Sequence, residues 1–381
     1  MKVAQIKVSN FNEFESRYSI LSQLEPHFLL VFASRSLLAD PQWFQRLRQC
    51  FPVAALLGCS TAGEIANDGV DDDCAVITAV HWQAGVPYCV ETELAGMADS
   101  EAAGQRLASA LNEQPLGGVI VLGQGVDING SALLQGLVAS LQTKVPVMGG
   151  LAGDGTAFSQ TLVLSNEGIS SHRIVAMAIP PEIHIGHGSF GGWQPFGPAR
   201  RVTRSVGNVL FELDAEPALD VYKRYLGEYA AQLPASGLLF PFEMLGQDHQ
   251  AMGVVRTILG VNEADGSLIL AGDIIADGYL RLMHASNDAL IEGAEAAAQA
   301  AQAMVTPANQ SLGLLVSCVG RKLVMGSRID EEIEAVADVF GQHVTLAGFY
   351  SYGEISPFVS STECKLHNQT MTITILSESQ R

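Results

Sequence analysis

Hydrophobic and polar positions along the chain repeat in one order: a buried strand, a helix, a second strand that ends in a glycine-rich loop, and a returning strand. The clearest copy covers residues 28–82. Its first strand, FLLVFAS (28–34), is almost wholly apolar, and Asp40 followed by proline predicts the start of an amphipathic helix. The second strand and its loop span residues 52–65, and CAVITAVHW (74–82) is the returning strand.

The same order recurs twice, over residues 118–166 and 312–376. The strand, helix, strand with loop, and return are expected at residues 118–125, 131–141, 145–155 and 161–166 in the middle copy, and at residues 312–318, 331–340, 344–355 and 369–376 in the last copy. Repeats of this kind predict an α/β fold with mixed sheets. We expect two lobes, with the first two copies filling one and the last copy anchoring the other.

A different pattern fills the stretch between the second and third copies. AMGVVRTILGV (251–261) and SLILAGDII (267–275) are typical of strands, and the turn signal EADG separates them. Ser286 predicts the N-cap of an alanine-rich helix that runs through Met304.

Composition narrows the function classes. A chain of 381 residues favours two domains, and 48% hydrophobic with 16% charged residues indicates a well-buried globular protein. The net charge of −19 argues against a nucleic-acid partner, because phosphates attract clustered Lys and Arg. No apolar run approaches the ~18 residues of a membrane helix, so no membrane insertion is expected. The six cysteines form no CxxC pair, which fits a reducing compartment, and we predict a cytoplasmic protein.

One loop motif occurs twice in the chain, as GCSTAGEI (58–65) and as GFYSYGEI (348–355). Glycines at a strand end let the backbone approach a ligand closely. The carboxylates that follow, Glu64 and Glu354, can accept hydrogen bonds from loop amides or meet a cationic group of a ligand. The alternative is a turn in which each acid satisfies its own backbone.

The last copy also offers candidates for a ligand pocket. We predict a pocket bounded by Arg321, Tyr350, Tyr352, Glu354 and His367, together with Glu64 as ligand-binding residues. An arginine after a strand end can hold a carboxylate with two hydrogen bonds. The alternatives are that Arg321 forms an internal salt bridge, with Glu354 as one candidate partner, and that His367 caps a neighbouring turn.

Five motifs together resemble the FIST family. They are GCSTAGEI (58–65), GGLAGDG (149–155), SCVGR (317–321), GFYSYGEISP (348–357) and LHNQT (366–370). The family is named for its occurrence in bacterial signal transduction and in eukaryotic F-box proteins. The resemblance implies a ligand-sensing protein with an N-terminal FIST region over residues 1–215 and a C-terminal FIST region over residues 216–381.

Some FIST proteins that lack a fused output domain are similar to haem-binding nitric-oxide sensors that act on a separate histidine kinase. No kinase, cyclase or receptor segment is recognisable here, so the resemblance implies this type. The implied cofactor is haem b, and the implied partner is a histidine kinase or another signalling protein. A sensor of an amino acid or similar metabolite is the alternative, and an enzyme of undescribed type is the third.

Two histidines are the candidates for holding the haem. His187, and after it His184, lie in HIGHGSFGGW (184–193), a glycine-rich stretch expected to be a flexible loop, with aromatic residues beside it to wall a porphyrin. The alternative is that both are ordinary polar loop residues. No metal other than a haem iron is expected.

Known catalytic motifs are not matched. In GCSTAG, two residues separate Ser60 from the next glycine, so the GxSxG nucleophile elbow is missed. GHGSFG (186–191) spells GxGxxG, but the prolines that follow exclude the helix that a dinucleotide site requires. We therefore predict a sensory protein rather than an enzyme.

Overall fold

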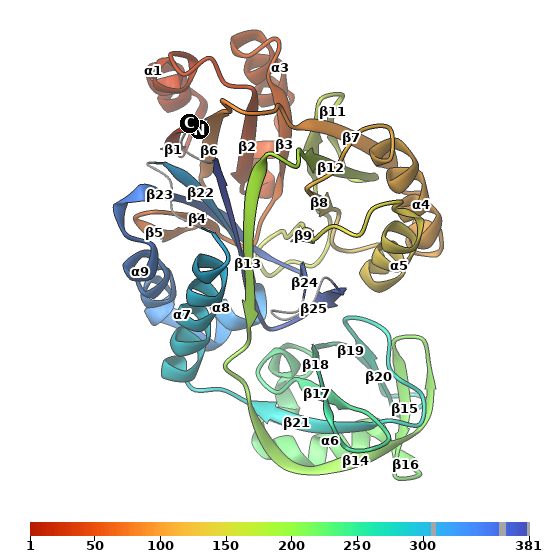
Figure 1. The fold of residues 1–381 in the computed structure, drawn as a ribbon. Coiled ribbons are helices and arrows are strands. Elements are labelled where there is room, and N and C mark those ends of the chain that lie inside the picture. Colours follow the sequence, from red (N-terminus) through yellow and green to blue (C-terminus); the bar gives the residue numbers. More distant parts are fainter. Residues whose placement is uncertain (306–309, 358–362, 379–381) are drawn as a thin grey trace.

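The computed structural model describes residues 1–305, 310–357 and 363–378. Figure 1 shows a large body to which both ends of the chain contribute, and a smaller lobe beneath it that is built from the middle of the chain. The predicted α/β fold class with mixed sheets is confirmed. Among the residues described, no helix combines the length and the apolar character needed to cross a membrane.

The first repeat unit has the predicted order. Its elements are β1 (Lys2–Val8), α1 (Phe11–Ser22), β2 (Phe28–Ala33), α2 (Arg35–Leu38), α3 (Pro41–Cys50), β3 (Ala55–Ser60), β4 (Glu64–Ala66), β5 (Gly69–Asp71) and β6 (Ala75–His81). Asp40 caps α3 as expected, by accepting a hydrogen bond from the backbone N–H of Gln42. β2 and β3 are parallel, and β6 returns antiparallel to β2.

The second unit repeats this order, but its returning strand lies later in the chain than predicted. Its elements are β7 (Tyr88–Glu93), α4 (Ser100–Leu111), β8 (Gly118–Gly123), α5 (Gly130–Ser140), β9 (Val147–Leu151), β10 (Val163–Ser165), β11 (Gly168–Ser170) and β12 (Arg173–Ile179). The return predicted at residues 161–166 holds only β10, because a turn at Asn166 and Glu167 folds the chain straight into β11. The strand that returns antiparallel to β8 is β12.

The third unit is divided in the sequence. Its elements are β13 (Ile183–Phe190), α7 (Asn287–Ala303), β22 (Ser311–Cys318), α8 (Val319–Met325), α9 (Ile329–Phe340), β23 (Val344–Ser351), β24 (Gly353–Pro357), β25 (Cys364–His367) and β26 (Met371–Glu378). Ser286 caps α7 as predicted. The stretch that holds His184 and His187 was expected to be a flexible loop, and this expectation is wrong: both residues lie in β13, which pairs with β26 along its whole length.

The smaller lobe is inserted between β13 and α7. Its elements are β14 (Gln194–Val206), β15 (Val209–Leu213), β16 (Glu216–Pro217), α6 (Ala218–Leu226), β17 (Phe242–Leu245), β18 (Ala251–Arg256), β19 (Ile258–Asn262), β20 (Ser267–Leu270) and β21 (Tyr279–His284), and its strands form one eight-stranded sheet. The chain leaves and re-enters the body at one place, since a Cβ on Gly192 would lie 2.0 Å from the carbonyl oxygen of Ala289. The insertion therefore begins and ends beside the start of α7.

Within the part of the chain that the structure describes, three six-stranded sheets form the body, and each is completed by a neighbouring unit. Their strand orders are β1-β6-β2-β3-β10-β11, β25-β24-β9-β8-β12-β7 and β13-β26-β22-β23-β4-β5. Each sheet takes four strands from one unit and a two-stranded hairpin from another: the second unit gives to the first, the third to the second, and the first to the third. This hairpin exchange is cyclic, so the three units form a single body.

The exchange corrects one prediction about the lobes. The third copy does not anchor a second lobe, because its sheet contains the hairpin of the first unit and its own hairpin completes the sheet of the second. The second lobe is the insertion instead. The division into regions 1–215 and 216–381 stays a prediction of the sequence.

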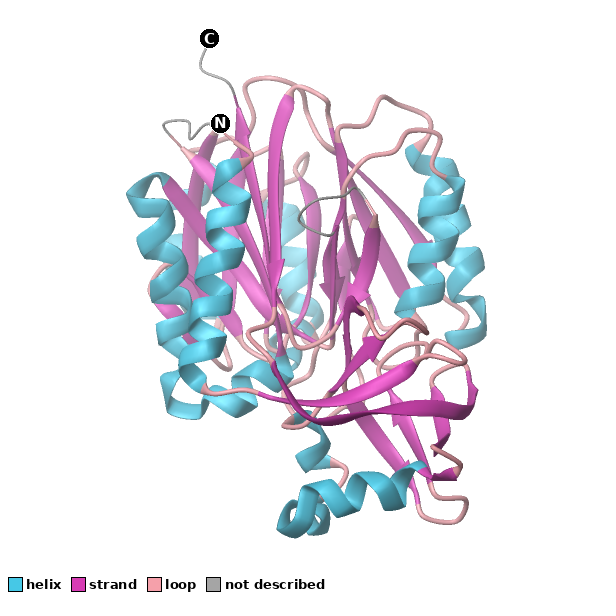
Figure 2. Ribbon diagram, turned by 60° about the horizontal axis from the view of Figure 1, so that its bottom comes forward, coloured by secondary structure: helices cyan, strands magenta, loops and turns pink. Residues whose placement is uncertain are grey.

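The core of the body lies between the three sheets. A central apolar cluster takes side chains from all of them, and Phe32 of β2 stacks on Phe349 of β23 with ring centroids 4.7 Å apart. Outer clusters lie beneath α1 and α3 on the first sheet, α4 and α5 on the second, and α7 and α9 on the third. Figure 2 shows these helices on the outside of the strands.

Three glycines mark the same position in the three units. Gly58, Gly149 and Gly348 each lie on the second parallel strand, opposite a residue in the first. A Cβ at any of the three would lie 2.0–2.1 Å from a carbonyl oxygen of that neighbouring strand. The requirement for close backbone approach explains why all three loops begin with glycine.

Candidate functional site

Loops from all three units meet around one cavity of about 650 Å³, which we call the polar cavity. Most of its lining follows the carboxyl ends of β2, β3, β9 and β22. This is the edge of the sheet at which α/β folds usually bind ligands. Its polar lining includes Arg35, Thr61, Glu64, Asp72, Asp73, Asp154, Thr156 and Lys322.

Charges of both signs line the polar cavity. Arg35 and Lys322 supply the cations, while Glu64, Asp73 and Asp154 supply carboxylates. Among the described residues, the exposed carboxylate of Asp73 has no ion-pair partner. A cavity of this kind can hold a ligand that carries a positive and a negative group at once.

Glu64 is the most deeply buried carboxylate of the polar cavity, with 1% of its surface exposed. One carboxylate oxygen accepts from the Thr61 hydroxyl, and the other accepts from the backbone N–H of Cys74 at 3.4 Å. Burial raises the pKa of Glu64 to about 7, because loss of solvation outweighs these hydrogen bonds. The carboxylate can therefore change its charge near neutral pH when a cation arrives.

Lys322 closes another side of the polar cavity from α8. Its Nζ donates to the Ala62 carbonyl at 2.9 Å and forms an ion pair with Asp72. Arg35 lines the polar cavity from the first unit, just after β2. Its Nη2 donates a hydrogen bond to Gln160 at 2.7 Å. A guanidinium has five N–H donors, so Arg35 keeps donors for a ligand oxygen.

The loop of the middle unit is held by an aromatic side chain of the third. The Tyr352 hydroxyl donates to Asp154, and the Tyr352 ring stacks on Phe158 with centroids 4.3 Å apart. Burial alone would raise the pKa of Asp154, but hydrogen bonds from Tyr352, Gln160 and Ser159 outweigh it and lower the pKa. Asp154 is therefore an anion that fixes its own loop.

A second cavity, which we call the apolar cavity, lies between the body and the inserted lobe and measures about 700 Å³. The body supplies residues from the loops after β8 and β9 and from α8, while the lobe supplies residues 232–239 and 258–259. Thr156 and Leu323 line both the polar and the apolar cavity. The two cavities are therefore neighbours with a common wall.

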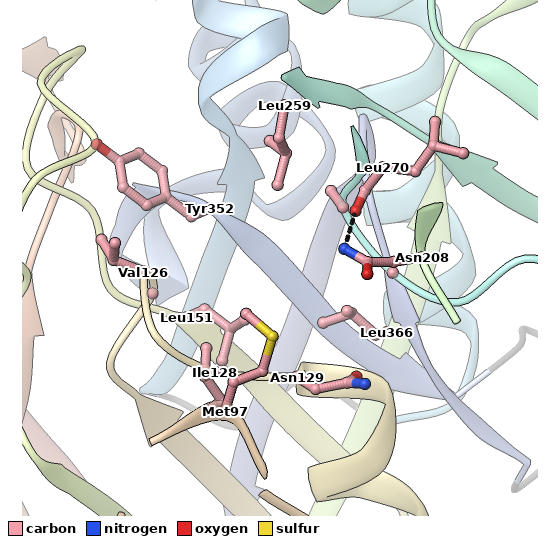
Figure 3. Close-up of a pocket in the computed structure, with 14 residues that line it drawn as sticks. Met97, Val126, Ile128, Asn129, Leu151, Asn208, Leu259, Leu270, Tyr352 and Leu366 are labelled. Atoms are coloured by element: carbon pink, nitrogen blue, oxygen red, sulfur yellow. Dashed lines mark hydrogen bonds between the residues drawn. The ribbon is translucent and has the colours of Figure 1, made fainter. Parts of the chain in front are cut away.

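A third, small cavity of about 80 Å³ continues from the apolar one, with which it shares Val126 and Leu259. Figure 3 shows Tyr352 at its edge and the hydrogen bond from Asn208 to the Leu270 carbonyl. Tyr352 is thus the predicted ligand-binding residue that lines this small cavity, while Glu64 lines the polar one.

The other predicted pocket residues lie inside the protein. Arg321 has no exposed surface and forms an ion pair with Glu332 of α9, with Nε 2.8 Å from a carboxylate oxygen. The Tyr350 hydroxyl donates to the same carboxylate at 2.6 Å. The predicted alternative of an internal salt bridge is therefore what the structure shows, but the partner is Glu332 rather than Glu354.

Glu354 is equivalent to Glu64, as the repeated motif predicts. Each glutamate accepts from a hydroxyl three residues earlier, Thr61 or Ser351, and from a backbone N–H just before the returning strand. Burial raises the pKa of Glu354 to about 7 as well. Unlike Glu64, which lines the polar cavity, Glu354 has no exposed surface and lines none of these three cavities.

His367 pairs with Glu354 across β24 and β25, and its Nε2 donates to the Ser356 carbonyl at 3.0 Å. Burial lowers the pKa of His367 to about 4. His367 is therefore a neutral imidazole packed in the interior of the protein. The six predicted ligand-binding residues are thus divided among two cavities and the interior, and a ligand role for each stays a prediction.

The two histidines predicted to hold haem face opposite sides of β13. His184 is exposed, whereas His187 is 4% exposed and, among described residues, its Nδ1 has no hydrogen-bond partner. Neither lines the polar or the apolar cavity. Beside them, Gly186 and Gly188 lie against carbonyl oxygens of α7, which explains the glycines of this stretch as packing residues.

Several cavity residues were not among the sequence-based candidates. Lys322 directly follows Arg321 in the SCVGR motif, and Asp73 belongs to a run of three aspartates beside a predicted returning strand. Both positions carried a signal, because charged residues next to strand ends belong to the edge that binds ligands. Arg35 carried the same signal after FLLVFAS.

Comparison with known families decides the relationship. The FIST N domain model matches residues 27–216, and the FIST C domain model matches residues 218–357. The chain belongs to the FIST family. FIST domains are sensors of small ligands in signalling, which agrees with the resemblance seen in the five motifs.

Individual similar proteins add little to this. An uncharacterized protein of Methanocaldococcus jannaschii is 24% identical over 221 residues, which are 53% of this chain and 41% of that protein. The chain therefore spans less than half of that relative. A cyanuric acid hydrolase from A. caulinodans aligns with a TM-score of 0.35 and 10% identity over 99% of both chains, a likeness too weak to support any conclusion.

Proposed function

We propose that this FIST protein senses a small molecule with both an ammonium and a carboxylate group, such as a free amino acid, in the polar cavity. The supporting observation is that Arg35 and Lys322 meet the carboxylates of Glu64 and Asp73 around one cavity at the carboxyl ends of strands. The volume of about 650 Å³ falls within the range of about 300–1,000 Å³ that is usual for ligand pockets.

The roles of the charged groups follow from their surroundings. Arg35 binds the ligand carboxylate with paired hydrogen bonds, because guanidinium and carboxylate match in geometry. Asp73, which is exposed, receives the ammonium group. Glu64 adds a second carboxylate for the same cation. Burial raises the pKa of Glu64 to about 7, and a bound ammonium group would favour the ionised form and so lower this pKa.

The output of this sensor is carried by a separate signalling protein, and a histidine kinase is the proposed partner, as the family resemblance implies. The proposal places this sensing in the cytoplasm. Binding occurs without conversion of the ligand: the Ser60 hydroxyl is fully buried, donates to the Gly153 carbonyl at 2.7 Å and accepts from the N–H of Leu162 at 2.8 Å, so it holds loops together.

Haem binding through His187 fits the structure poorly, and His184 and His187 cannot hold one iron together. The side chains of the two residues point to opposite faces of β13, and that of His187 lies in the packed interior. A porphyrin at His187 would have to separate β13 from its neighbours. Haem and nitric oxide thus remain a prediction of the family resemblance, which a Soret band in protein reconstituted with haem would support.

Thermal shift and calorimetry with a panel of free amino acids test the proposed function. At least one amino acid should raise the melting temperature, since a ligand that binds only the folded state stabilises it. Arg35→Met and Asp73→Asn should each raise Kd by about tenfold or more, because a hydrogen bond to a charged group contributes about 1.5–3 kcal/mol.

Arg201→Met is the matched control for Arg35→Met. Arg201 lies on the lobe with 57% of its side chain exposed and pairs with Asp277 at 3.6 Å, away from both cavities. Its substitution should leave Kd unchanged. Binding that survives both cavity substitutions at full strength would contradict the assignment to the polar cavity.

A further inference from the structure

Exposed apolar side chains gather at the apolar cavity. Val126, Phe158, Leu259 and Leu323 all line it, and each has between 37% and 47% of its surface exposed. Single exposed apolar residues are ordinary, but several around one cavity mark a binding surface. The four residues come from four separate segments, so the gathering is made by the fold rather than by one apolar stretch of sequence.

The apolar cavity differs from the polar cavity in charge. Among the residues that the structure describes, none that lines the apolar cavity carries a charge, whereas the polar cavity has cations and anions. Thr156 and Leu323 belong to both linings. A molecule long enough to reach past these two side chains would meet charged groups in the polar cavity and the uncharged lining in the apolar cavity.

We propose that the ligand is amphiphilic, with a charged head in the polar cavity and an uncharged, apolar chain in the apolar cavity. This inference rests on the proposed function and adds the class of ligand: an α-amino acid with a long aliphatic or aromatic side chain, rather than a small polar one. Phe158 and Leu323 form the body side of the apolar site, and Leu259 forms the lobe side.

The apolar chain of the ligand also joins the two parts of the protein. The lobe side of the cavity is tied to the body by a hydrogen bond from Gln369 to the Leu238 carbonyl at 2.9 Å. A second bond runs from Arg256 to the Leu366 carbonyl at 3.1 Å. A chain lying between these parts contacts both, so its length affects how firmly the lobe is held against the body.

A homologous series of ligands tests the inference. Calorimetry with alanine, norvaline, norleucine and longer linear homologues should show Kd falling about fourfold for each added methylene while the chain remains within the cavity. The corresponding fatty acids, which lack the ammonium group, should bind at least tenfold more weakly than the matching amino acids.

Variants locate the effect. In Leu259→Ser and Leu323→Ser, Kd should depend less on chain length than in the parent. Both residues are exposed, so the fold should be retained, which the melting temperature checks. Ile20→Ser is the matched control, since Ile20 is an exposed apolar residue of α1 that lines neither cavity.

The outcomes separate the two proposals. If polar amino acids bind and Kd is the same along the series, the amphiphilic ligand is refuted while the proposed function stands. If fatty acids bind as tightly as the matching amino acids, the ammonium group is not recognised, and both the proposed amino-acid ligand and this inference are overturned. If no amino acid of either kind binds, the proposed function fails, and this inference with it.

Discussion

Arg321 and Glu332 form an ion pair in which neither side chain has exposed surface. The guanidinium also donates to the carbonyl oxygens of Gly191 and Leu290, and the carboxylate also accepts from Tyr350. These bonds join α7, α8, α9 and β23 at one point. A buried pair with all its hydrogen bonds made is tolerated, but removal of one partner leaves a charge without compensation.

Arg321→Met should therefore lower the free energy of unfolding by about 3–5 kcal/mol, with or without ligand, because Glu332 would stay buried without its cation. Urea denaturation followed by circular dichroism measures this loss. Adding Glu332→Gln to the same variant should recover part of it.

Arg328→Met is the control, since Arg328 pairs with Glu331 and Asp288 at the surface. Its substitution should change stability by less than about 1 kcal/mol. If Arg321→Met instead melts like the parent and loses only its response to ligand, Arg321 is a ligand residue after all.

A second residue-scale prediction concerns pH. The pKa of Glu354 rises from its ordinary value to about 7 on folding, so between these values the folded protein binds more protons than the unfolded chain. Its contribution to stability is therefore largest in acid and falls as pH rises toward 7. Glu354→Gln should remove a decrease of about 1 kcal/mol per pH unit, measured by urea denaturation from about pH 5 to about pH 8.

Glu101→Gln serves as its control, because Glu101 is an exposed carboxylate of α4. This variant should keep the pH dependence of the parent. A Glu354→Gln variant whose stability runs parallel to that of the parent across the range would show that Glu354 titrates normally.

At the residue scale, the sequence predicted side-chain positions correctly where a motif is repeated. It did not predict them where adjacent side chains point to different places. The two Gly-Glu loops predicted the equivalence of Glu64 and Glu354, because the same local hydrogen bonds follow from the same loop. Arg321 and Lys322 are adjacent, yet one lies in the core and the other lines the polar cavity. Their directions depend on how α8 packs, which is decided by contacts with distant segments.

At the scale of secondary-structure elements, the glycine-rich stretch that was predicted to be a flexible loop forms β13 and packs against α7. A Cβ on Gly186 or Gly188 would lie 2.2 Å or 2.0 Å from a carbonyl oxygen of α7. The glycines of HIGHGSFGGW thus let a helix lie directly on a strand, although the same composition is typical of a flexible loop. The alanines of α7, including Ala297 and Ala301, complete this close contact.

Gly188→Ala should lower the free energy of unfolding by about 1–3 kcal/mol, because the new methyl group would force α7 away from β13. Gly260→Ala is its control: Gly260 is also in a strand, but its nearest contact would be an ordinary 3.5 Å to Ile269. Urea denaturation of both variants makes the comparison. An equal effect of the two substitutions would mean that close packing on α7 is not what Gly188 provides.

At the scale of the molecule, the order of the repeats was visible in the sequence and their association was not. The strand-helix-strand pattern predicted the three units, but hairpins such as β4–β5 are only a few residues long and have no pattern of their own. Each hairpin pairs with a different unit because the loop before it leads the chain out of its own sheet, and the direction of that loop depends on tertiary packing. The inserted lobe was likewise recognised as strands, without a sign that its two ends meet beside Gly192.

The cyclic exchange of hairpins also bears on how the protein is made. β4 leaves the ribosome early, yet β23, its partner in the third sheet, is synthesised long afterwards. The second sheet likewise stays incomplete until β24 has been synthesised. An unpaired strand edge can pair wrongly, and contacts between distant segments form slowly. The nascent chain therefore carries open sheet edges until its third unit emerges, and those edges are exposed to wrong pairing while translation continues.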